Sequence, residues 1–479
     1  PDGRRLKQAR PAAVGRTTSD KTGRPIDKMP YLEPKNRSMF RRQFVKQSTL
    51  TIAGMGLVAA VPVELLAALR KKTAPAERMG IGLIGCKGMG WSNLTAMLKV
   101  SEAHCTALCD VDDSVLQQRK NELARLDMVP ALYKDYRKLL EDKTVQVVII
   151  ATPDHWHCLQ MCDALAAGKH ILLEKPASNS VAEAELMVAV AARYPNLMVQ
   201  VNQWQRSQQH FKDAIAFVQS GKLGTIAQCK TWMYNGHKQL PQAADGPVPE
   251  GVDYTMWLGP AAKRPFNGNR FHYNFRWYWD YAGGLMTDWG VHLIDMVIAG
   301  MQAQRPISVA GMGGHLAYPA DARETPDTQT ALYTYKGFQL SWEHTMGRQY
   351  GPFGMSHGIA FIGSNGTLLL NRSGWEVRPE KEAGNERMAA VGFQKQVDVG
   401  VEKHARNLIE AIQASNSKLL NCPLPVAAET AIHCHLGNIA LRTGQVIGIN
   451  NNRGTLTTNY KQANKLLKPT YHNGWKWPS

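Results

Sequence analysis

A lysine that directly follows a short apolar segment is the first candidate for chemistry in this chain. Lys175 lies in the tripeptide Glu174-Lys175-Pro176, and residues 170–173 before it read His-Ile-Leu-Leu. A cationic amine at the end of a buried strand can hold or move a proton while a hydride is transferred. Because a Lys-Pro step can also be a plain turn, the weight of this motif depends on the segments around it.

A glycine-rich segment at residues 85–90, Gly-Cys-Lys-Gly-Met-Gly, follows apolar residues and precedes a predicted helix. Backbone N–H groups at the start of such a helix can hold a pyrophosphate. Asp110 ends the next predicted strand, where a carboxylate can accept hydrogen bonds from ribose hydroxyls and repels a 2′-phosphate. These features predict an NAD site and disfavour NADP. The candidate cofactor-binding residues here are Gly85, Lys87, Gly88, Met89, Gly90 and Asp110.

Lys87 departs from the Gly-x-Gly-x-x-Gly pattern of dinucleotide-binding loops. It stands where the second glycine usually lets a phosphate approach the backbone closely. Two arrangements would accommodate it: Gly88 takes over that role in a shifted loop, or Lys87 points away and lends its charge to the site. A structural turn that binds no nucleotide is the alternative to both.

A third motif, Ala-Thr-Pro-Asp-His-Trp-His at residues 151–157, follows another apolar segment. The carboxyl ends of parallel strands line the ligand crevice of an open sheet, so Thr152 and Pro153 are expected to border the nicotinamide. His155 and His157 could suggest a metal, but no third ligand stands at metal-binding spacing, and we predict none. The remaining cofactor-binding candidates are His157, Glu174 and Lys175.

The segment 283–295 holds two aspartates and a histidine that a helix would place on one face. Asp288, His292 and Asp295 are spaced at i, i+4 and i+7. A carboxylate beside a histidine can orient the ring and stabilise its cation, as proton abstraction from an alcohol requires. The alternative is a solvated polar face. Aromatic and charged residues just before this segment could stack on a sugar and hydrogen-bond its hydroxyls. The substrate candidates are Arg276, Trp277, Tyr278, Asp288 and His292.

The elements that must position these residues follow two patterns. Over residues 79–202, uninterrupted apolar segments alternate with helical ones, which predicts a parallel sheet covered on both faces. After residue 203, strand-like segments joined by tight turns predict an α+β domain with a largely antiparallel, open sheet. Two late helices, 402–414 and 427–443, are expected to cover that second sheet. The expected fold class is therefore α/β, with a Rossmann dinucleotide-binding domain followed by an α+β domain.

The predicted boundaries give four parts: 1–38, a disordered segment or misassigned start; 39–76, a twin-arginine signal and linker; 77–202, the Rossmann NAD(P)-binding domain; and 203–479, an α/β domain for substrate binding and oligomerisation. The signal prediction rests on Arg41-Arg42, followed by Phe44, Lys46 and the apolar residues 50–63. This pattern resembles a twin-arginine (Tat) export signal. It predicts a periplasmic protein that meets the Tat machinery, and an amphipathic arm is the alternative.

The net charge of +17 is concentrated near the amino terminus. Residues 1–38 carry +6 and residues 39–72 carry +5, which leaves a mildly basic body. Composition therefore does not support a nucleic-acid partner. None of the eight cysteines forms a Cys-x-x-Cys pair, and we do not expect a disulfide framework.

Together these motifs resemble the Gfo/Idh/MocA family, the relatives of glucose–fructose oxidoreductase and inositol dehydrogenase. The resemblance extends from residue 79 to the C-terminus, and it rests on the glycine loop, the Ala-Thr-Pro and Glu-Lys-Pro motifs and residues 283–292. Residues 254–260 and 464–475 are similar to an exported, Bacteroidetes-type branch. The resemblance implies that Lys175, Asp288 and His292 are the catalytic residues.

What the family resemblance implies is hydride exchange between a carbon of a sugar, polyol or glycoside and the nicotinamide of NAD(P). His292 would take the hydroxyl proton, Lys175 would stabilise developing alkoxide charge, and Asp288 would orient the site. Because the periplasm offers little free NAD, an exported enzyme is expected to carry its nucleotide tightly bound. An open antiparallel sheet often pairs with another subunit, so we expect a homodimer or homotetramer.

Two other functions remain open at this point. One is an NAD-dependent glycosidase or lyase that works through oxidation and elimination. The other is a non-catalytic sugar- or nucleotide-binding protein on the same fold. The presence of Lys175, Asp288 and His292 slightly disfavours the second of these. The particular sugar and the direction of the reaction are not set by the sequence.

Overall fold

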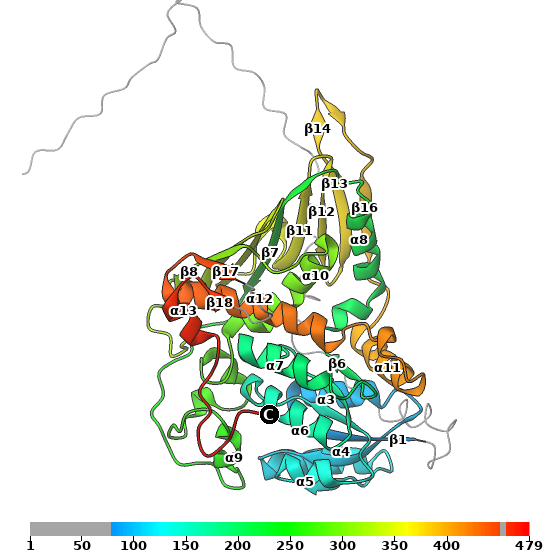
Figure 1. Ribbon diagram of the computed structural model, residues 1–479, viewed down its shortest axis with the longest axis vertical. Helices are drawn as coiled ribbons and strands as arrows, with labels where there is room; N and C mark the ends of the chain where they lie inside the picture. Colours follow the sequence, from blue (N-terminus) through cyan, green and yellow to red (C-terminus); the bar gives the residue numbers. More distant parts are fainter. Residues whose placement is uncertain (1–77, 451–456, 479) are drawn as a thin grey trace, which may run out of the picture. The chain divides into compact units, whose positions relative to one another are not determined.

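A computed structural model of the chain describes residues 78–450 and 457–478 (Figure 1). The predicted twin-arginine segment and the segment 1–38 lie outside the described residues. Within the described part, no helix is long and apolar enough to cross a bilayer. All eight cysteines are described, and each is a free, buried thiol.

The first sheet has six parallel strands in the order β3-β2-β1-β4-β5-β6. They are β1 (Met79–Ile84), β2 (Ala103–Cys109), β3 (Ala131–Tyr133), β4 (Val147–Ile150), β5 (His170–Leu173) and β6 (Val199–Val201). The strand order reverses between β1 and β4, and ligands of open α/β sheets bind at the carboxyl ends of the strands beside such a reversal. This is the Rossmann arrangement that the alternating pattern predicted.

The inner strands of the first sheet are largely buried on both faces, as their apolar sequences require, whereas β3 at the edge is partly exposed. In β4, Val147 and Ile149 pack into the core on the α3 side, whereas Val148 and Ile150 pack on the α6 side. Side chains alternate between the two faces along a strand, so both cores draw on the same four residues. The covering helices are α3 (Gly88–Met97), α4 (Asp113–Ala124), α5 (Tyr136–Glu141), α6 (His157–Ala166) and α7 (Val181–Ala191).

The second sheet has ten strands in the order β16-β13-β12-β11-β7-β10-β9-β8-β17-β18. All its neighbours are antiparallel except β7 and β10, which run parallel, so the sheet is largely antiparallel as predicted. Its strands are β7 (Ile226–Asn235), β8 (Ser308–Gly314), β9 (Thr328–Thr334), β10 (Gln339–Met346), β11 (His357–Gly363), β12 (Gly366–Asn371), β13 (Gly374–Pro379), β16 (Val391–Lys395), β17 (Ile447–Asn450) and β18 (Thr457–Thr458). A separate hairpin pairs β14 (Lys381–Glu382) with β15 (Asn385–Glu386).

One face of the second sheet is covered by α8 (Gln209–Gln219), α10 (Val291–Met301) and α12 (Leu424–Thr443). The expectation that both late helices cover this sheet is wrong for α11 (Gly400–Gln413). Leu408 and Ile409 of α11 share a core with Leu94 and Met97 of α3, so α11 covers the first sheet. Apolar spacing shows which face of a helix is buried but does not show against which sheet.

Helix α12 lies between the two sheets (Figure 1). Its Ala427 and Ala431 belong to a core of the first sheet, whereas Ile432 and Leu436 belong to the core of the second. The buried helix α12 therefore packs against both sheets and joins them.

Candidate active site

Lys175 joins the carboxyl edge of the first sheet to the second domain. It lies just past β5, and its Nζ donates hydrogen bonds of 2.6 Å to Asp288 Oδ1 and 2.8 Å to the Asp288 carbonyl oxygen. Asp288 belongs to η8 (Met286–Gly290), a π-helical turn that leads into α10. The structure thus brings together two of the three predicted catalytic residues, which are 113 positions apart in sequence.

Arg276 reaches the same carboxylate from η7 (His272–Trp277), with its Nε 3.3 Å from Asp288 Oδ1. Burial alone would raise the pKa of Asp288, but the charges of Lys175 and Arg276 lower it well below its ordinary value. Asp288 is therefore an anion throughout the physiological range. Asp288 Oδ2 has no hydrogen-bond partner among the residues that the structure describes.

His292 follows Asp288 in the first turn of α10, and its side chain is buried between two indole rings. The ring centroids of Trp204 and Trp289 lie 6.1 and 6.3 Å from that of the imidazole. Burial, with the charges of Arg372 and Lys175, lowers the pKa of His292 well below its ordinary value. A neutral imidazole of this kind can accept a proton at neutral pH.

Asp288 and His292 do not hydrogen-bond to each other in the described structure, and His292 Nδ1 is buried without a partner. The predicted arrangement, in which a carboxylate orients the histidine directly, is therefore not the one that this structure contains. Asp288 is bonded to Lys175 and Arg276 instead.

Asp295, the third residue of the predicted helical face, lies in a different cluster. Arg206 donates two hydrogen bonds of 2.7 Å to its two carboxylate oxygens, and Thr430 donates a third of 3.0 Å. The i, i+4, i+7 prediction assumed a regular α-helix. The π turn at η8 changes the register before α10 begins, and the two aspartates then have separate partners.

Glu174 fixes the backbone of the Glu174-Lys175-Pro176 tripeptide through hydrogen bonds. Its Oε1 accepts hydrogen bonds from Asn93 on α3 at 2.7 Å and from Asn202 after β6 at 2.6 Å, while its Oε2 accepts the Lys175 N–H at 3.1 Å. The carboxylate is 5 % exposed. A buried acceptor with three donors fixes the backbone from which Lys175 extends.

The loops that follow β4 and β5 are joined by His157. Its Nδ1 lies 2.7 Å from the Pro176 carbonyl oxygen and its Nε2 3.0 Å from the Thr152 carbonyl oxygen. Both ring nitrogens are thus occupied by the two loops, and the structure leaves His157 no free nitrogen to offer a cofactor. The described residues hold no cluster of three or more His, Cys, Asp or Glu that could bind a metal.

Asp154 is a site residue that the sequence reasoning quoted within a motif but did not single out. It is 6 % exposed in η4 (Asp154–Trp156), directly after the loop of β4. Burial raises its pKa to about 8, although the charges of Lys175 and Arg276 act in the opposite direction. The carboxyl group is therefore largely protonated at pH 7. Its place at the end of a buried strand is the signal that could have identified it.

The glycine loop has the geometry that a pyrophosphate needs. Gly85 has φ +87°, and a Cβ there would lie 2.6 Å from the Ala151 carbonyl oxygen. At Gly90, a Cβ would lie 1.9 Å from the Gly85 carbonyl oxygen, so helix and strand approach as only glycine allows. Gly88 has φ +49°, and a Cβ there would meet nothing within 4 Å.

Lys87 is exposed at the N-cap of α3 with φ −98°, a conformation open to any residue. The open space beside the backbone lies at Gly88. The N–H groups of Gly88 and Met89 are the first of the helix and have no acceptor within it. Of the two predicted arrangements, the geometry fits the one in which Gly88 offers the close approach. The loop fits a dinucleotide in spite of Lys87.

Asp110 ends β2 beside this loop. Its Oδ2 accepts the Cys86 N–H at 2.7 Å, and its Oδ1 accepts the Asp112 N–H at 3.1 Å. Burial raises the pKa of Asp110 to about 6, while these two N–H groups oppose the rise. The group is mainly anionic at pH 7, as a partner for ribose hydroxyls should be.

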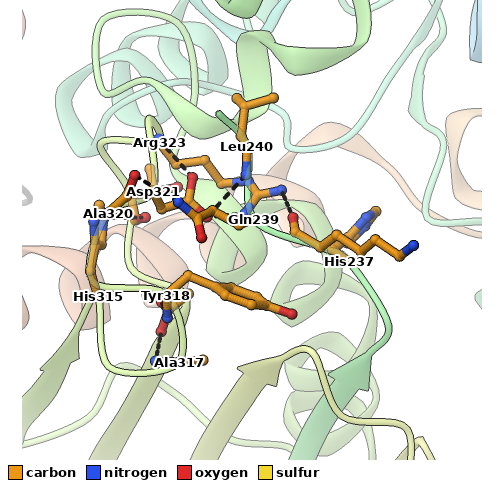
Figure 2. Close-up of polar contacts among 12 residues, drawn as sticks. His237, Gln239, Leu240, His315, Ala317, Tyr318, Ala320, Asp321 and Arg323 are labelled. Atoms are coloured by element: carbon orange, nitrogen blue, oxygen red, sulfur yellow. Dashed lines mark hydrogen bonds and ion pairs between the residues drawn. The ribbon is translucent and has the colours of Figure 1, made fainter. Parts of the chain in front are cut away.

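Two loops that pack beside Trp277 are joined by polar contacts, and Figure 2 shows residues 237–240 of one and 315–323 of the other. Arg323 donates a hydrogen bond of 2.7 Å to the Lys238 carbonyl oxygen and forms a buried ion pair with Asp321. Its Cζ lies 5.3 Å above the Trp277 ring, and the His237 ring lies 5.5 Å from Trp277 on centroids. Trp277 is therefore a buried ring against which Arg323 and His237 pack.

Tyr278 is also buried, but it belongs to the core of the second sheet. Burial raises its pKa to about 12. Among the three consecutive substrate candidates, only Arg276 contacts the Lys175–Asp288 pair. His237, Trp204 and Arg372 were not predicted, because they come from segments that carry no recognisable motif. Trp289 stands within the segment 283–295, but its role beside His292 was not recognised.

Two family models match the chain in succession. One, described as an oxidoreductase family with an NAD-binding Rossmann fold, matches residues 79–203. The other, described as an oxidoreductase family C-terminal alpha/beta domain, matches residues 200–316. Both models carry the Gfo/Idh/MocA name.

Individual proteins show the same likeness. The glycosyl hydrolase family 109 protein 2 of Shewanella sp. (strain ANA-3) is 32 % identical over 160 residues, 30 % of this chain and 35 % of that protein. The chain thus spans about a third of that relative. The uncharacterized oxidoreductase YrbE of Bacillus subtilis (strain 168) is 26 % identical over 294 residues, 61 % of this chain and 73 % of YrbE.

Solved structures share the fold. The crystal structure of scyllo-inositol dehydrogenase from Lactobacillus casei, with bound NAD(H) and scyllo-inositol, aligns with a TM-score of 0.57 at 19 % identity. The alignment covers 78 % of this chain and 99 % of that one. With its paired domains, glycine loop and Lys175–Asp288 contact, the chain belongs to the Gfo/Idh/MocA family of oxidoreductases through residues 79–316.

Proposed function

We propose that this protein oxidises or reduces a hydroxyl carbon of a sugar, polyol or glycoside with NAD as the hydride carrier. The observation that carries the proposal is the contact between Lys175 and Asp288 beside the neutral, buried His292. A cation, an anion and a proton acceptor meet at the carboxyl edge of a dinucleotide-binding sheet. Alcohol oxidation needs these groups, because a proton leaves the oxygen while a hydride leaves the carbon.

The proposed roles follow from the protonation states. His292 accepts the hydroxyl proton through the ring nitrogen that faces the substrate. Lys175 donates a hydrogen bond to the same oxygen and stabilises its developing negative charge, while Asp288 holds the Lys175 amine in place. Bound NAD would supply the site that accepts the hydride or returns it. Acid–base assistance of this kind contributes about 10²–10⁴ in rate.

The cofactor proposal is NAD, held tightly. Asp110 is an anion beside the loop, and an anion there repels the 2′-phosphate of NADP. The twin-arginine pattern at residues 41–42 supports export to the periplasm with the nucleotide already bound. Denaturing the purified protein and measuring released nucleotide by absorbance and mass spectrometry tests this point. Absence of nucleotide would count against tight binding.

A second candidate function is an NAD-dependent glycosidase, favoured by the segment that is 32 % identical to a glycosyl hydrolase family 109 protein. Oxidation of a ring hydroxyl to a ketone would acidify the neighbouring C–H. Loss of that proton would expel the glycosidic oxygen, water would add to the resulting double bond, and the hydride first removed would return to the ketone. The net reaction is hydrolysis, and the nucleotide is unchanged.

One assay separates these functions. The protein is incubated with excess NAD and a panel of free sugars and polyols, and NADH is followed at its absorbance band. In parallel, an aryl glycoside is supplied with only catalytic NAD. Net NADH with a free sugar supports the dehydrogenase, whereas aryl release without net NADH supports the glycosidase. If neither assay shows turnover and the Lys175→Met and His292→Ala variants bind sugar as the parent does, a non-catalytic binding protein remains.

A further inference from the structure

Arg372 is a cation near His292 whose two Nη nitrogens have no acceptor among the described residues. It lies in the turn between β12 and β13, and its guanidinium packs against two indole rings. Its Cζ lies 4.3 Å from the centroid of Trp289 and 4.6 Å from that of Trp204. The same two indoles flank the imidazole of His292, so the arginine and the proposed base share one aromatic cleft.

The guanidinium is fixed at one corner only. Arg372 Nε donates a hydrogen bond of 3.2 Å to Gln205 Oε1. No carboxylate of the described residues lies within ion-pair distance of it, whereas the neighbouring arginines are all paired. Those pairs are Arg276 with Asp288, Arg206 with Asp295, and Arg323 with Asp321.

The two Nη nitrogens of Arg372 have no acceptor among the described residues, and they are not among the buried atoms that lack a partner. They therefore keep accessible surface. Since Trp204 and Trp289 both pack close to the Arg372 Cζ and Nε is already bonded to Gln205, the Nη edge is the part of the guanidinium that can bind a ligand. A planar edge with two parallel donors matches the two oxygens of a carboxylate.

The side chains around His292 carry a net positive charge. Lys175, Arg276 and Arg372 supply three cations against the single carboxylate of Asp288, because the raised pKa of Asp154, about 8, keeps that group largely neutral at pH 7. Burial lowers the pKa of Arg372 to about 10, which still leaves it charged. A ligand with one negative charge would offset part of this excess.

Resting on the proposed function, we propose that Arg372 binds a carboxylate of the substrate, so that the enzyme acts on a sugar acid in preference to the neutral sugar. The acid group would contact the Nη edge while the reacting hydroxyl faces His292, and the Trp204 and Trp289 rings would flank both. A single guanidinium edge suits one carboxylate better than a phosphate dianion, which usually takes more donors.

The test compares matched pairs of substrates, namely glucuronate with glucose and galacturonate with galactose, under excess NAD. For the parent protein, a charged hydrogen bond predicts a kcat/KM about 10- to 100-fold higher for at least one acid than for its neutral partner. Arg372→Gln should raise KM for the acid, so that the ratio of kcat/KM for the acid to kcat/KM for its neutral partner falls toward one.

Two further variants serve as controls. Arg372→Lys keeps the charge without the planar edge and should retain part of the preference. Arg378→Gln, at an exposed position on neighbouring β13, should retain all of it. Thermal unfolding of each variant shows whether the fold is intact, and a ligand-induced rise in Tm with glucuronate gives a binding readout independent of turnover.

The outcomes separate the two proposals. Turnover of neutral sugars at least as fast as the acids, or of a sugar phosphate faster than both, overturns the carboxylate assignment and leaves the oxidoreductase proposal standing. A preference that survives in Arg372→Gln places the acid-binding group elsewhere and also overturns it. Failure of every sugar to reduce NAD removes the proposed function and this inference with it.

Discussion

Two aspartates seven positions apart, Asp288 and Asp295, stand in two clusters that use the same kinds of groups differently. Asp295 is 1 % exposed, and three hydrogen bonds from Arg206 and Thr430 engage both its oxygens. Asp288 receives Lys175 and Arg276 on one oxygen, and its other oxygen has no partner in the described structure. We call these the sealed cluster and the site cluster.

The difference lies in what each cluster leaves unused. The sealed cluster joins α10 to η5 (Trp204–Ser207) and to α12, and every charge in it is satisfied by another part of the chain. The site cluster retains an unpartnered carboxylate oxygen, a histidine without a partner at Nδ1 and the free edge of Arg372. Buried polar groups are normally satisfied, so unused ones gathered at a sheet edge indicate a place for a ligand.

The largest effect is expected from breaking the site cluster. Lys175→Met and Asp288→Asn should each lower kcat by about 10²–10⁴, since the first removes the cation and the second releases it. Both side chains are largely buried, 10 % and 16 % exposed, so each variant should also lose some stability, and turnover is compared per folded molecule. Steady-state kinetics and thermal unfolding, with Lys134→Met at an exposed ion pair as the control, measure this. A large fall in Tm without loss of turnover per folded molecule would show that the site cluster is structural.

The opposite result is expected from the sealed cluster. Asp295→Asn should destabilise the fold by about 3–5 kcal/mol, because it leaves the Arg206 charge buried without its partner. Turnover per folded molecule should be retained. Denaturant unfolding measures the loss, and Glu122→Gln, which breaks the more exposed pair with Arg119, should cost no more than about 1 kcal/mol. Equal losses in the two variants would contradict the distinction.

The sequence predicted Lys175 at the carboxyl edge of the parallel sheet, but it joined Lys175 to Asp288, a residue of the second domain, only through the family resemblance. It did not separate Asp288 from Asp295, since residue spacing assumes a regular helix and says nothing of the π turn at η8. Local spacing also could not assign α11 to the first sheet. Its amphipathic face is plain in the sequence, but its partner, α3, lies about three hundred positions away, as the Lys99–Glu402 pair shows.

Arg372 shows the limit most clearly. It is a turn residue between two strands, and its contacts Trp204, Gln205 and Trp289 come from two other segments with no common motif. Nothing in the spacing of these residues joins them before the second sheet is folded. Asp154, in contrast, stands within a motif that was recognised, and its position after a buried strand would have been enough to single it out, although it was not predicted.

The site cluster also predicts the pH dependence of activity. Because burial and nearby cations lower the pKa of His292, the imidazole stays neutral as the pH falls below 6.5, and the acid limb of kcat/KM should lie below that value. Removing a cation makes protonation easier and raises the pKa. In Arg372→Gln the limb should therefore move to higher pH, measured on a neutral sugar. A wild-type limb at or above pH 6.5 would contradict His292 as the base.

The smallest effect is expected at Lys87, a charge that neither cluster contains. It is exposed and has a φ of −98°, so Lys87→Gly should leave NAD affinity within a few-fold. Lys87→Glu should weaken NAD binding by about 0.3–1 kcal/mol through repulsion of the pyrophosphate, yet leave the Tm unchanged or slightly higher, because an acidic residue suits a helix N-terminus.

Gly88→Ala is the matched comparison for Lys87. The added Cβ has open space but a φ of +49°, so it should cost about 1–2 kcal/mol in stability and obstruct the approach of the phosphate. Titration of the nucleotide-free protein with NAD measures all three variants. Suppose that Lys87→Gly raised the affinity for NAD tenfold and Gly88→Ala had no effect. The pyrophosphate would then approach the backbone at residue 87, as in an ordinary Gly-x-Gly loop. If instead Gly88→Ala weakened NAD binding and Lys87→Gly changed it little, the loop would bind phosphate one residue further along, at Gly88. The exposed charge of Lys87 would then contribute little, because water already screens it.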